Sequence, residues 1–281
     1  MKKIIFTLAL AAAAVSCTKF TPAPDPEVPA GGQVTVTASV SDVFGTPFKW
    51  SDTDAIGIYN MEKTLSNVMY VPMNAFIGKT GEATLYGSEV SGSLVAYYPY
   101  SDKGSTAVGE GRIPLSPSIR YCESALSQIM DNILLLANGN GGKFVFECPT
   151  GALHMKLAFE IEGDNVIKSA TLHSPAAFVS GKLAIDEKAE EPITEGGNDL
   201  TLYGISRKIS PSEALDIWFP VPAGEYKFLE LHLLTQSGVN VVKPVPGTFV
   251  VVKGRITEAA VGDDRNDYGG SDLEIIPGIF D

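Results

Sequence analysis

The amino-acid sequence predicts an all-β protein built from two antiparallel β-sandwich domains. Three observations support this class. Apolar and polar residues alternate with a period of two along much of the chain, Gly, Pro, Asn and Ser separate the alternating runs, and no long helical pattern lies between them. Closely spaced strands without intervening helices favour antiparallel sheets packed face to face over a parallel α/β fold.

The predicted strands begin at residue 34. The first, Val34 to Val40, alternates valine and alanine with threonine and serine, as expected for a strand with one buried face. The clearest alternation runs from Leu153 to Ile161. The other predicted strands are Leu94–Tyr98, Lys143–Cys148, Val166–His173, Leu200–Ile205, Leu215–Phe219, Tyr226–Thr235 and Thr248–Lys253.

Two stretches allow more than one structure. Between Ser124 and Ala137 the apolar residues fit a short helix or an irregular crossover, and the leucine run at the end also fits a strand. Residues 138–142, Asn-Gly-Asn-Gly-Gly, separate two stretches of domain size and predict a domain boundary, although Asn-Gly is also a hairpin turn signal. The predicted domains are residues 33–140 and residues 141–262.

The first 32 residues predict export and membrane attachment. Residues 1–3 include two positively charged lysines, and residues 4–15 form an apolar stretch that is too short to span a bilayer. The small residues at 14–16 run into Cys17 and resemble the lipobox of bacterial lipoproteins. Cleavage before Cys17 would remove residues 1–16 as a signal peptide and leave a lipidated cysteine, followed by a Pro- and Ala-rich tether up to residue 32. The alternative is an ordinary secretory signal.

The charge balance excludes nucleic acid as a partner. The 281 residues hold 21 Lys+Arg and 33 Asp+Glu, a net charge of −12 that becomes −14 without residues 1–16, because that segment holds two lysines and no acid. Phosphate binding needs a basic surface, and an acidic surface is repelled by anionic lipid headgroups. Membrane attachment therefore depends on the lipid at Cys17, and whether the protein faces the periplasm or the outside stays open.

The sequence offers little material for catalysis or metal binding. It contains no Gly-x-Ser-x-Gly elbow, and His154, His173 and His232 each lie in a strand pattern where a solvent-facing or hydrogen-bonded structural role is expected. The segment 263–269 resembles a calcium loop only in part, because Ile275 stands where the bidentate Glu is needed. We therefore expect no metal, no cofactor and no enzymatic activity.

The remaining cysteines and the aromatic residues have structural interpretations. In an oxidising compartment Cys122 and Cys148 either form a disulfide or stay as separate buried thiols. Trp50, Trp218 and the run Tyr97–Tyr100 could stack on sugar rings. Because all of them adjoin predicted strands, we expect them to pack in a core or at a domain edge.

The most specific motif is the decapeptide WSDTDAIGIY at residues 50–59. It resembles the Trp…Asp-x-Ile-Gly-Ile/Val-Tyr signature of the Bacteroidetes fimbrillin-like lipoproteins, the Mfa-like branch of the type V pilin superfamily. The segment YYPYS at residues 97–101 is similar to another element of that family, and further matches in the same order cover most of residues 33–261. The motif residues are Trp50, Asp54, Ile56, Gly57, Tyr59, Tyr97, Tyr98, Pro99 and Tyr100.

The resemblance implies two sandwiches of transthyretin-like topology in an outer-membrane lipoprotein, displayed at the cell surface or in a fimbrium. In such pilins a protease cuts after a basic residue and removes the first strand, and a C-terminal strand of a neighbouring subunit replaces it. Here Val34–Val40 would be the removable strand and Lys49 the cleavage site. The donor strand would lie in the tail, residues 263–281, through Leu273, Ile275, Ile276, Ile279 and Phe280.

Two features depart from the pilin pattern. Maturation usually needs an arginine shortly after the first strand, whereas the first arginine is Arg112 and Lys49 is the only basic residue between Lys19 and Trp50. Pro277 interrupts the tail and removes one backbone donor from an inserted strand. Both features favour an anchor or tip subunit, or a monomeric surface lipoprotein, over a shaft subunit.

The sequence therefore predicts a non-enzymatic, fimbrillin-like surface lipoprotein with a structural or adhesive role. Its expected partners are other pilus subunits or copies of itself through donor-strand exchange, the membrane through the lipid anchor, and a host glycan or protein. The alternative is a surface lipoprotein that binds carbohydrate or protein and never polymerises.

Overall fold

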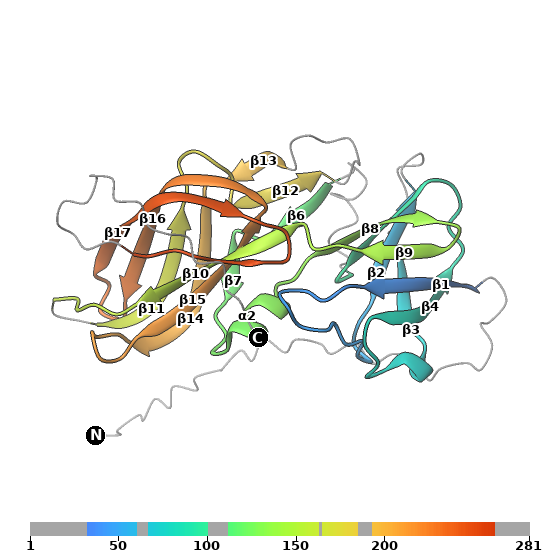
Figure 1. Cartoon of the computed structure of the whole chain (residues 1–281), viewed down its shortest axis with the longest axis horizontal. Coiled ribbons are helices and arrows are strands. Elements are labelled where there is room, and N and C mark those ends of the chain that lie inside the picture. Colours follow the sequence, from blue (N-terminus) through green and yellow to red (C-terminus); the bar gives the residue numbers. More distant parts are fainter. Residues whose placement is uncertain (1–32, 61–66, 101–111, 163–164, 185–192, 262–281) are drawn as a thin grey trace, which may run out of the picture.

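The computed structural model describes residues 33–60, 67–100, 112–162, 165–184 and 193–261, and this part of the chain is built almost wholly from β-strands (Figure 1). Its helical elements are α2 (Ala125–Met130) and the short 3-10 turn η1 (Asn74–Phe76). The all-β prediction is confirmed. None of the helices in the described ranges is long and apolar enough to cross a membrane.

The N-terminal strands form a closed barrel, on the right of Figure 1. Its sheet order is β1 (Gln33–Val40), β4 (Glu82–Ser88), β3 (Val68–Pro72), β2 (Ile56–Asn60), β5 (Leu94–Tyr98), β8 (Leu135–Asn140) and β9 (Lys143–Phe146). The sheet closes because β1 pairs antiparallel with β4 on one side and parallel with β9 on the other. This closure differs from the expected antiparallel sandwich with open edges.

The remaining strands form three further sheets, on the left of Figure 1. The first has the order β15 (Leu215–Pro222), β10 (Thr150–Leu157) and β18 (Ile256–Glu258). The second has five strands in the order β17 (Asn240–Val251), β16 (Gly224–Thr235), β11 (Val166–His173), β14 (Asp199–Lys208) and β7 (Ser118–Arg120). The third has the order β13 (Ile193–Gly197), β12 (Ser180–Ala184) and β6 (Arg112–Leu115). One hydrophobic core joins the first two of these sheets, with Met155 and Phe219 from one and Leu172 and Leu231 from the other. We call these strands the C-terminal sheets.

The segment 138–142 is a hairpin turn within the barrel. Gly139 pairs with Phe144 and Asn140 with Lys143, so Gly141 and Gly142 form a two-residue loop. Both glycines have positive φ, +58° and +77°, which matches the right-handed twist of the two strands. The turn alternative, not the boundary, therefore describes this segment, and the strand pairings change from one group to the other after Phe146.

Two strands that precede this turn belong to the C-terminal sheets. β6 pairs with β12, and β7 runs parallel to β14. The chain therefore crosses from the barrel to the C-terminal sheets, returns to complete the barrel with β8 and β9, and then crosses again. The sequence pattern did not predict this double crossing, because strand pairing is set by contacts between distant residues.

The ambiguous stretch Ser124–Ala137 contains both a helix and a strand. The Ser124 hydroxyl accepts a hydrogen bond from Ser127 N and caps α2, which then lies against β15. The leucine run enters the barrel instead, as β8. The helix and strand expectations for this stretch are thus both correct, each for its own half.

Candidate strand-exchange site

The candidate site is the position of β1 between β4 and β9, which we call the β1 site. The β1–β4 ladder runs from the pair Gln33–Ser88 to the pair Ser39–Glu82, and the β1–β9 ladder from Thr37–Lys143 to Val40–Phe146. At its end β1 is fixed by bonds from Thr37 N to Gly142 O and from Val40 N to Gly81 O, each 2.9 Å. β1 is the first described strand of the chain, and it fills a gap between two strands that come from far along the sequence.

Three apolar side chains of β1 point into the barrel. Val36, Ala38 and Val40 are buried in the core that also holds Leu85 and Phe144. Burial of an aliphatic side chain of this kind contributes about 1.5–3 kcal/mol. The strand is therefore part of the barrel core, and its departure would open two strand edges and the apolar interior together.

The segment that follows β1 is tied to the barrel at Gly81. The Gly81 carbonyl accepts from Val40 N at 2.9 Å and from Trp50 Nε1 at 3.3 Å, and Gly81 N donates to Phe48 O at 3.0 Å. The end of β1 and the two aromatic residues around Lys49 are thus held by one residue. Gly81 has φ +78°, a conformation that glycine adopts without strain.

Lys49, the expected cleavage site, has an exposed side chain between two buried neighbours. Phe48 and Trp50 are 3% and 1% exposed, Trp50 N donates to Lys79 O at 3.1 Å, and Lys49 forms an isolated β-bridge with Thr80. A protease needs several extended residues on each side of the cut bond. The geometry allows cleavage at Lys49 only after Phe48 and Trp50 leave the core.

The two family motifs meet around Trp50. Phe48, Trp50 and Tyr98 pack edge to face, with ring centroids 5.0 to 6.2 Å apart. Asp54 accepts from Ser51 N at 2.6 Å and from the Tyr98 hydroxyl at 2.9 Å. Burial raises the pKa of Asp54, opposed by these hydrogen bonds, and burial beside Asp54 raises the pKa of Tyr98. Residues about 45 positions apart thus form one structural unit.

The second contact between the motifs involves Gly57. A Cβ added at Gly57 would lie 2.1 Å from Tyr97 Cε1, so the Tyr97 ring covers the bare backbone of β2. The Tyr97 hydroxyl donates to Asn67 Oδ1 at 2.8 Å, and Tyr100 N donates to Ala55 O at 2.9 Å. The two motifs thus meet where the Tyr97 side chain approaches the backbone at Gly57.

The other motif residues complete the same unit. Ile56 lies in the barrel core, and Pro99 follows a cis peptide bond after Tyr98. Tyr59 packs with Tyr97 on the outer side of β2 and β5, and burial raises its pKa. Within the described residues the Tyr59 hydroxyl has no hydrogen-bond partner.

Some expected site residues lie outside the described residues. They are the lipidation candidate Cys17, the donor candidates Leu273, Ile275, Ile276, Ile279 and Phe280, and the calcium-like segment 263–269. Sequence reasoning also overlooked Phe48 and Gly81 as parts of the β1 site, whereas Ala38 lies in the predicted strand Val34–Val40. Only Gly81 left a signal, since it follows Lys79-Thr80 directly before a strand, which is a turn pattern.

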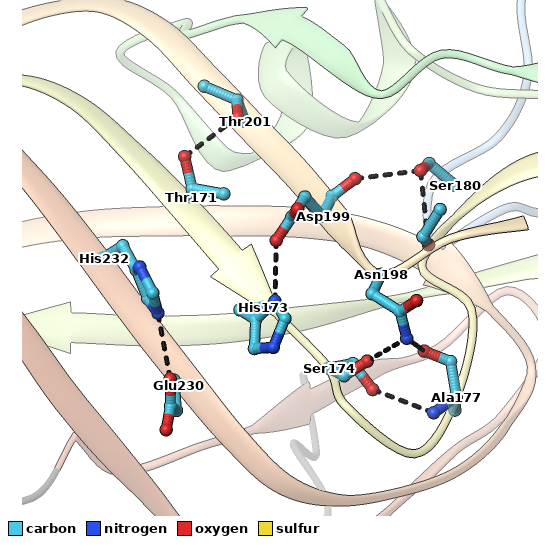
Figure 2. Close-up of polar contacts among 11 residues, drawn as sticks. Thr171, His173, Ser174, Ala177, Ser180, Asn198, Asp199, Thr201, Glu230 and His232 are labelled. Atoms are coloured by element: carbon cyan, nitrogen blue, oxygen red, sulfur yellow. Dashed lines mark hydrogen bonds and ion pairs between the residues drawn. The ribbon is translucent and has the colours of Figure 1, made fainter.

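The three histidines are hydrogen-bonded strand residues, as expected. His173 and His232 lie on the outer face of the five-stranded sheet and donate to Asp199 at 2.8 Å and to Glu230 at 3.0 Å (Figure 2). His154 lies between Asp216 and Glu258, at 2.9 and 2.6 Å, and stacks on Trp218 with ring centroids 4.7 Å apart. The described residues contain no group of three or more His, Cys, Asp or Glu placed to hold a metal ion.

The cysteines and tryptophans also have structural surroundings. Cys122 and Cys148 are free thiols, and burial is the main cause that raises the pKa of each. The tryptophans pack as expected, because Trp50 is buried and Trp218 is stacked on His154.

No protein-family model matches the chain, and no curated protein sequence matches it. Solved structures of similar fold include a Bacteroides ovatus protein whose name refers to cell adhesion (13% identity, 80% of this chain and 90% of that chain covered, TM-score 0.44). Two others are from Porphyromonas gingivalis. The tip fimbrial protein Mfa3 is 10% identical, with 83% of this chain and 96% of that chain covered and a TM-score of 0.35. The fimbrial anchor protein Mfa2 is 9% identical, with 74% of this chain and 80% of that chain covered and a TM-score of 0.37. The names of these solved structures refer to fimbrial and cell adhesion proteins of Bacteroidetes, the group that the motifs of this chain resemble.

Proposed function

We propose that the chain is a fimbrial-type cell-surface lipoprotein whose barrel is completed by an exchangeable strand. The observation that carries the proposal is the placement of β1, a strand near the start of the chain that alone closes the barrel between β4 and β9. An internal strand could not leave its sheet without dragging both flanking segments. On its C-terminal side β1 is joined to the rest of the barrel by the segment 41–50, so cleavage after Lys49 would separate the strand from the barrel.

The β1 site is suited to accept a strand from another subunit. Without β1, β4 and β9 would each present unpaired backbone groups beside an apolar interior, which is the arrangement that binds an added strand. Main-chain bonds then supply affinity, and the positions of Val36, Ala38 and Val40 select side chains. The donor would be the C-terminal tail, residues 263–281, of another pilus subunit or of a second copy.

In this proposal the N-terminal segment determines the cellular location of the protein. Signal peptidase removes residues 1–16, Cys17 carries the lipid, and the tether to residue 32 presents the folded part at the outer membrane, on the cell surface or in a fimbrium. The two groups of strands act as two domains of transthyretin-like topology. The role is structural or adhesive, as a structural or accessory (anchor or tip) pilus subunit, and non-enzymatic.

A second candidate is a surface lipoprotein that binds carbohydrate or protein and keeps β1 permanently. The observation that favours it is the protection of Lys49 by the buried side chains of Phe48 and Trp50. Under the first proposal, cleavage at Lys49 follows the departure of β1, because Gly81 holds the end of β1 and both aromatic residues together. Under the second, cleavage never occurs.

A disulfide lock separates the two candidates. Thr35 and Tyr86 are directly paired on β1 and β4, and the pair Thr35→Cys with Tyr86→Cys would tie β1 in place. The matched control locks the C-terminal sheets through Thr171→Cys with Thr201→Cys, also a direct pair. Both are expressed in the native host, with assembly read from ladders in unboiled electrophoresis and the N-terminus read by mass spectrometry.

Strand exchange predicts ladders for the wild type and for the control lock. It predicts none for the β1 lock until reductant is added, and a mature N-terminus at Trp50 in the assembled form. Ladders from the oxidised β1 lock would overturn strand exchange. A wild type that keeps lipidated Cys17 and never forms a ladder argues against a shaft subunit.

A further inference from the structure

The β1 site selects side chains by size. At the middle of β1, Ala38 is completely buried between its pairing partners Ala83 on β4 and Phe144 on β9, themselves 0% and 1% exposed. A larger side chain at this position would have to displace these neighbours or the backbone. Val36 and Val40, two residues to either side, are larger and also buried. A strand in this site therefore needs an apolar residue, a small residue and an apolar residue at alternate positions.

The C-terminal sequence contains this pattern once. Among residues 262–281, a Gly, Ala or Ser with apolar residues two positions before and after it occurs only at Gly278, between Ile276 and Phe280. We propose that the tail of a second copy enters the β1 site with Gly278 in the place of Ala38, Ile276 in the place of Val36 and Phe280 in the place of Val40. This register rests on the proposed strand exchange and specifies its partner.

The register gives Pro277 a position that the site tolerates. Pro277 takes the place of Thr37, whose N–H donates to Gly142 O at 2.9 Å, so one hydrogen bond to the β8–β9 turn is lost. N–H groups alternate in direction along a strand. Because Val40 N points to Gly81 O before β4, the N–H groups at positions 36 and 38 point toward β4, and those donors are kept.

A shift of one residue is much worse. It would place Pro277 at the position of Ala38, where the ring is too large for the space between Ala83 and Phe144 and the bond toward β4 is lost as well. In the proposed register, Glu274 takes the place of the half-buried Val34 and Asp281 that of the exposed Ser41. Asp281 thus avoids the core, whereas Glu274 takes the place of a side chain that packs, partly buried, against the barrel core.

The register can be tested in the full chain by exchanging strand sequences. In graft A, residues 33–40 are replaced by the sequence of residues 273–280, and in graft B by that of residues 272–279. Both grafts contain the same proline and nearly the same composition, so they differ mainly in register. Graft A is expected to unfold cooperatively on heating, whereas graft B is expected to show no thermal unfolding transition of the barrel.

Single substitutions measure the size limit directly. Ala38→Leu in the natural β1 is expected to lower the Tm by about 4–12 °C through overpacking, and Ala38→Gly by less than about 4 °C. In graft A, a threonine in place of the proline restores the donor to Gly142 and raises the Tm by about 2–6 °C.

Each outcome of the graft experiment is decisive. Equal stability of the two grafts, or full tolerance of Ala38→Leu, overturns the register and leaves strand exchange standing. If neither graft forms the barrel, the tail is not the occupant of this site. The disulfide lock tests strand exchange itself and does not depend on either result.

Discussion

The barrel and the C-terminal sheets deal with unpaired strand edges in different ways. The barrel has no edge, because β1 pairs with both β4 and β9, so its closure depends on one eight-residue strand near the chain start. The five-stranded sheet stays open and ends in β17 and the short β7. An edge strand attracts other chains unless something blocks it.

Two prolines block the β17 edge. Lys243 and Val245 point inward, and the intervening Pro244 pairs with Glu230. Backbone direction alternates along a strand, so positions 244 and 246 face away from β16, and both are proline and lack an N–H. Exposed valines 242 and 250 would otherwise favour pairing with another chain. The comparison teaches that the two regions protect their edges differently, the barrel by closure through β1 and the five-stranded sheet by prolines on β17.

The largest expected effect comes from removing the aromatic centre of the barrel. Trp50→Ala removes the ring that contacts Phe48 and Tyr98, and we expect a loss of about 3–5 kcal/mol in barrel stability. Phe219→Ala is the matched variant in the C-terminal core, where Phe219 is also fully buried, and should cost a similar amount there.

Limited digestion with trypsin distinguishes the two variants. Trp50→Ala is expected to speed cleavage after Lys49 by more than tenfold relative to the wild type, because the segment that protects Lys49 loses its anchor. Phe219→Ala should leave that cleavage slow. Equal rates at Lys49 in both variants would show that the barrel and the C-terminal sheets unfold as one unit.

A smaller effect is expected at the contact between β2 and β5. Gly57→Ala places a methyl group against the Tyr97 ring, and overpacking of this kind costs about 1–3 kcal/mol. Gly224→Ala on β16 is the control, since a Cβ there meets nothing within 4 Å. Urea unfolding of the two variants checks the difference, and an equal loss of stability would contradict the packing role of Gly57.

Local patterns predicted much of this fold. Strands β5 and β11 begin and end where the sequence predicts. In β11 one face is buried and apolar residues alternate with polar ones, whereas β5 is a short apolar run that is buried on both faces. The closure of the barrel by β1 was not predictable in this way. A parallel pairing between residues 37–40 and 143–146 depends on how the whole sheet curls, and no local pattern records it.

The candidate site was predictable only in part. Asp54, Gly57 and Tyr98 were identified through a motif, and the structure joins them by contacts that local sequence does not show. The alternation along Val34–Val40 predicts that Ala38 is buried, but it does not show which residues surround it. The proposed size limit at this position comes from Ala83 and Phe144, which lie on two other strands and pair with Ala38.

A change at the β17 edge tests whether the prolines keep copies apart. Pro244→Thr with Pro246→Thr returns two N–H donors to the open edge, each of which adds about 0.5–1.5 kcal/mol when it pairs. We expect concentration-dependent dimers in light scattering, while the wild type stays monomeric with its barrel closed. Thr248→Ser lies on the same strand and leaves the number of backbone N–H donors unchanged, so it serves as the control substitution. A double variant that stays monomeric at millimolar concentration would contradict the blocking role.

The smallest expected effect is a pH dependence at the junction of the two motifs. Burial raises the pKa of Asp54 above its usual 3.8, so the folded protein binds this proton more tightly than the unfolded chain does. Stability from this residue is therefore fully present below pH 3.8 and falls as the pH rises through the folded pKa, then stays constant.

The variant Asp54→Asn tests this dependence, because its side chain cannot titrate. The free energy of unfolding of the wild type minus that of the variant, measured in urea from pH 3 to 7, should decline with pH, because charging Asp54 leaves a buried carboxylate that Ser51 N–H and the Tyr98 hydroxyl only partly compensate. A difference that rises with pH would mean that these two hydrogen bonds outweigh burial, and that the motif junction holds a stabilised carboxylate instead of a strained one.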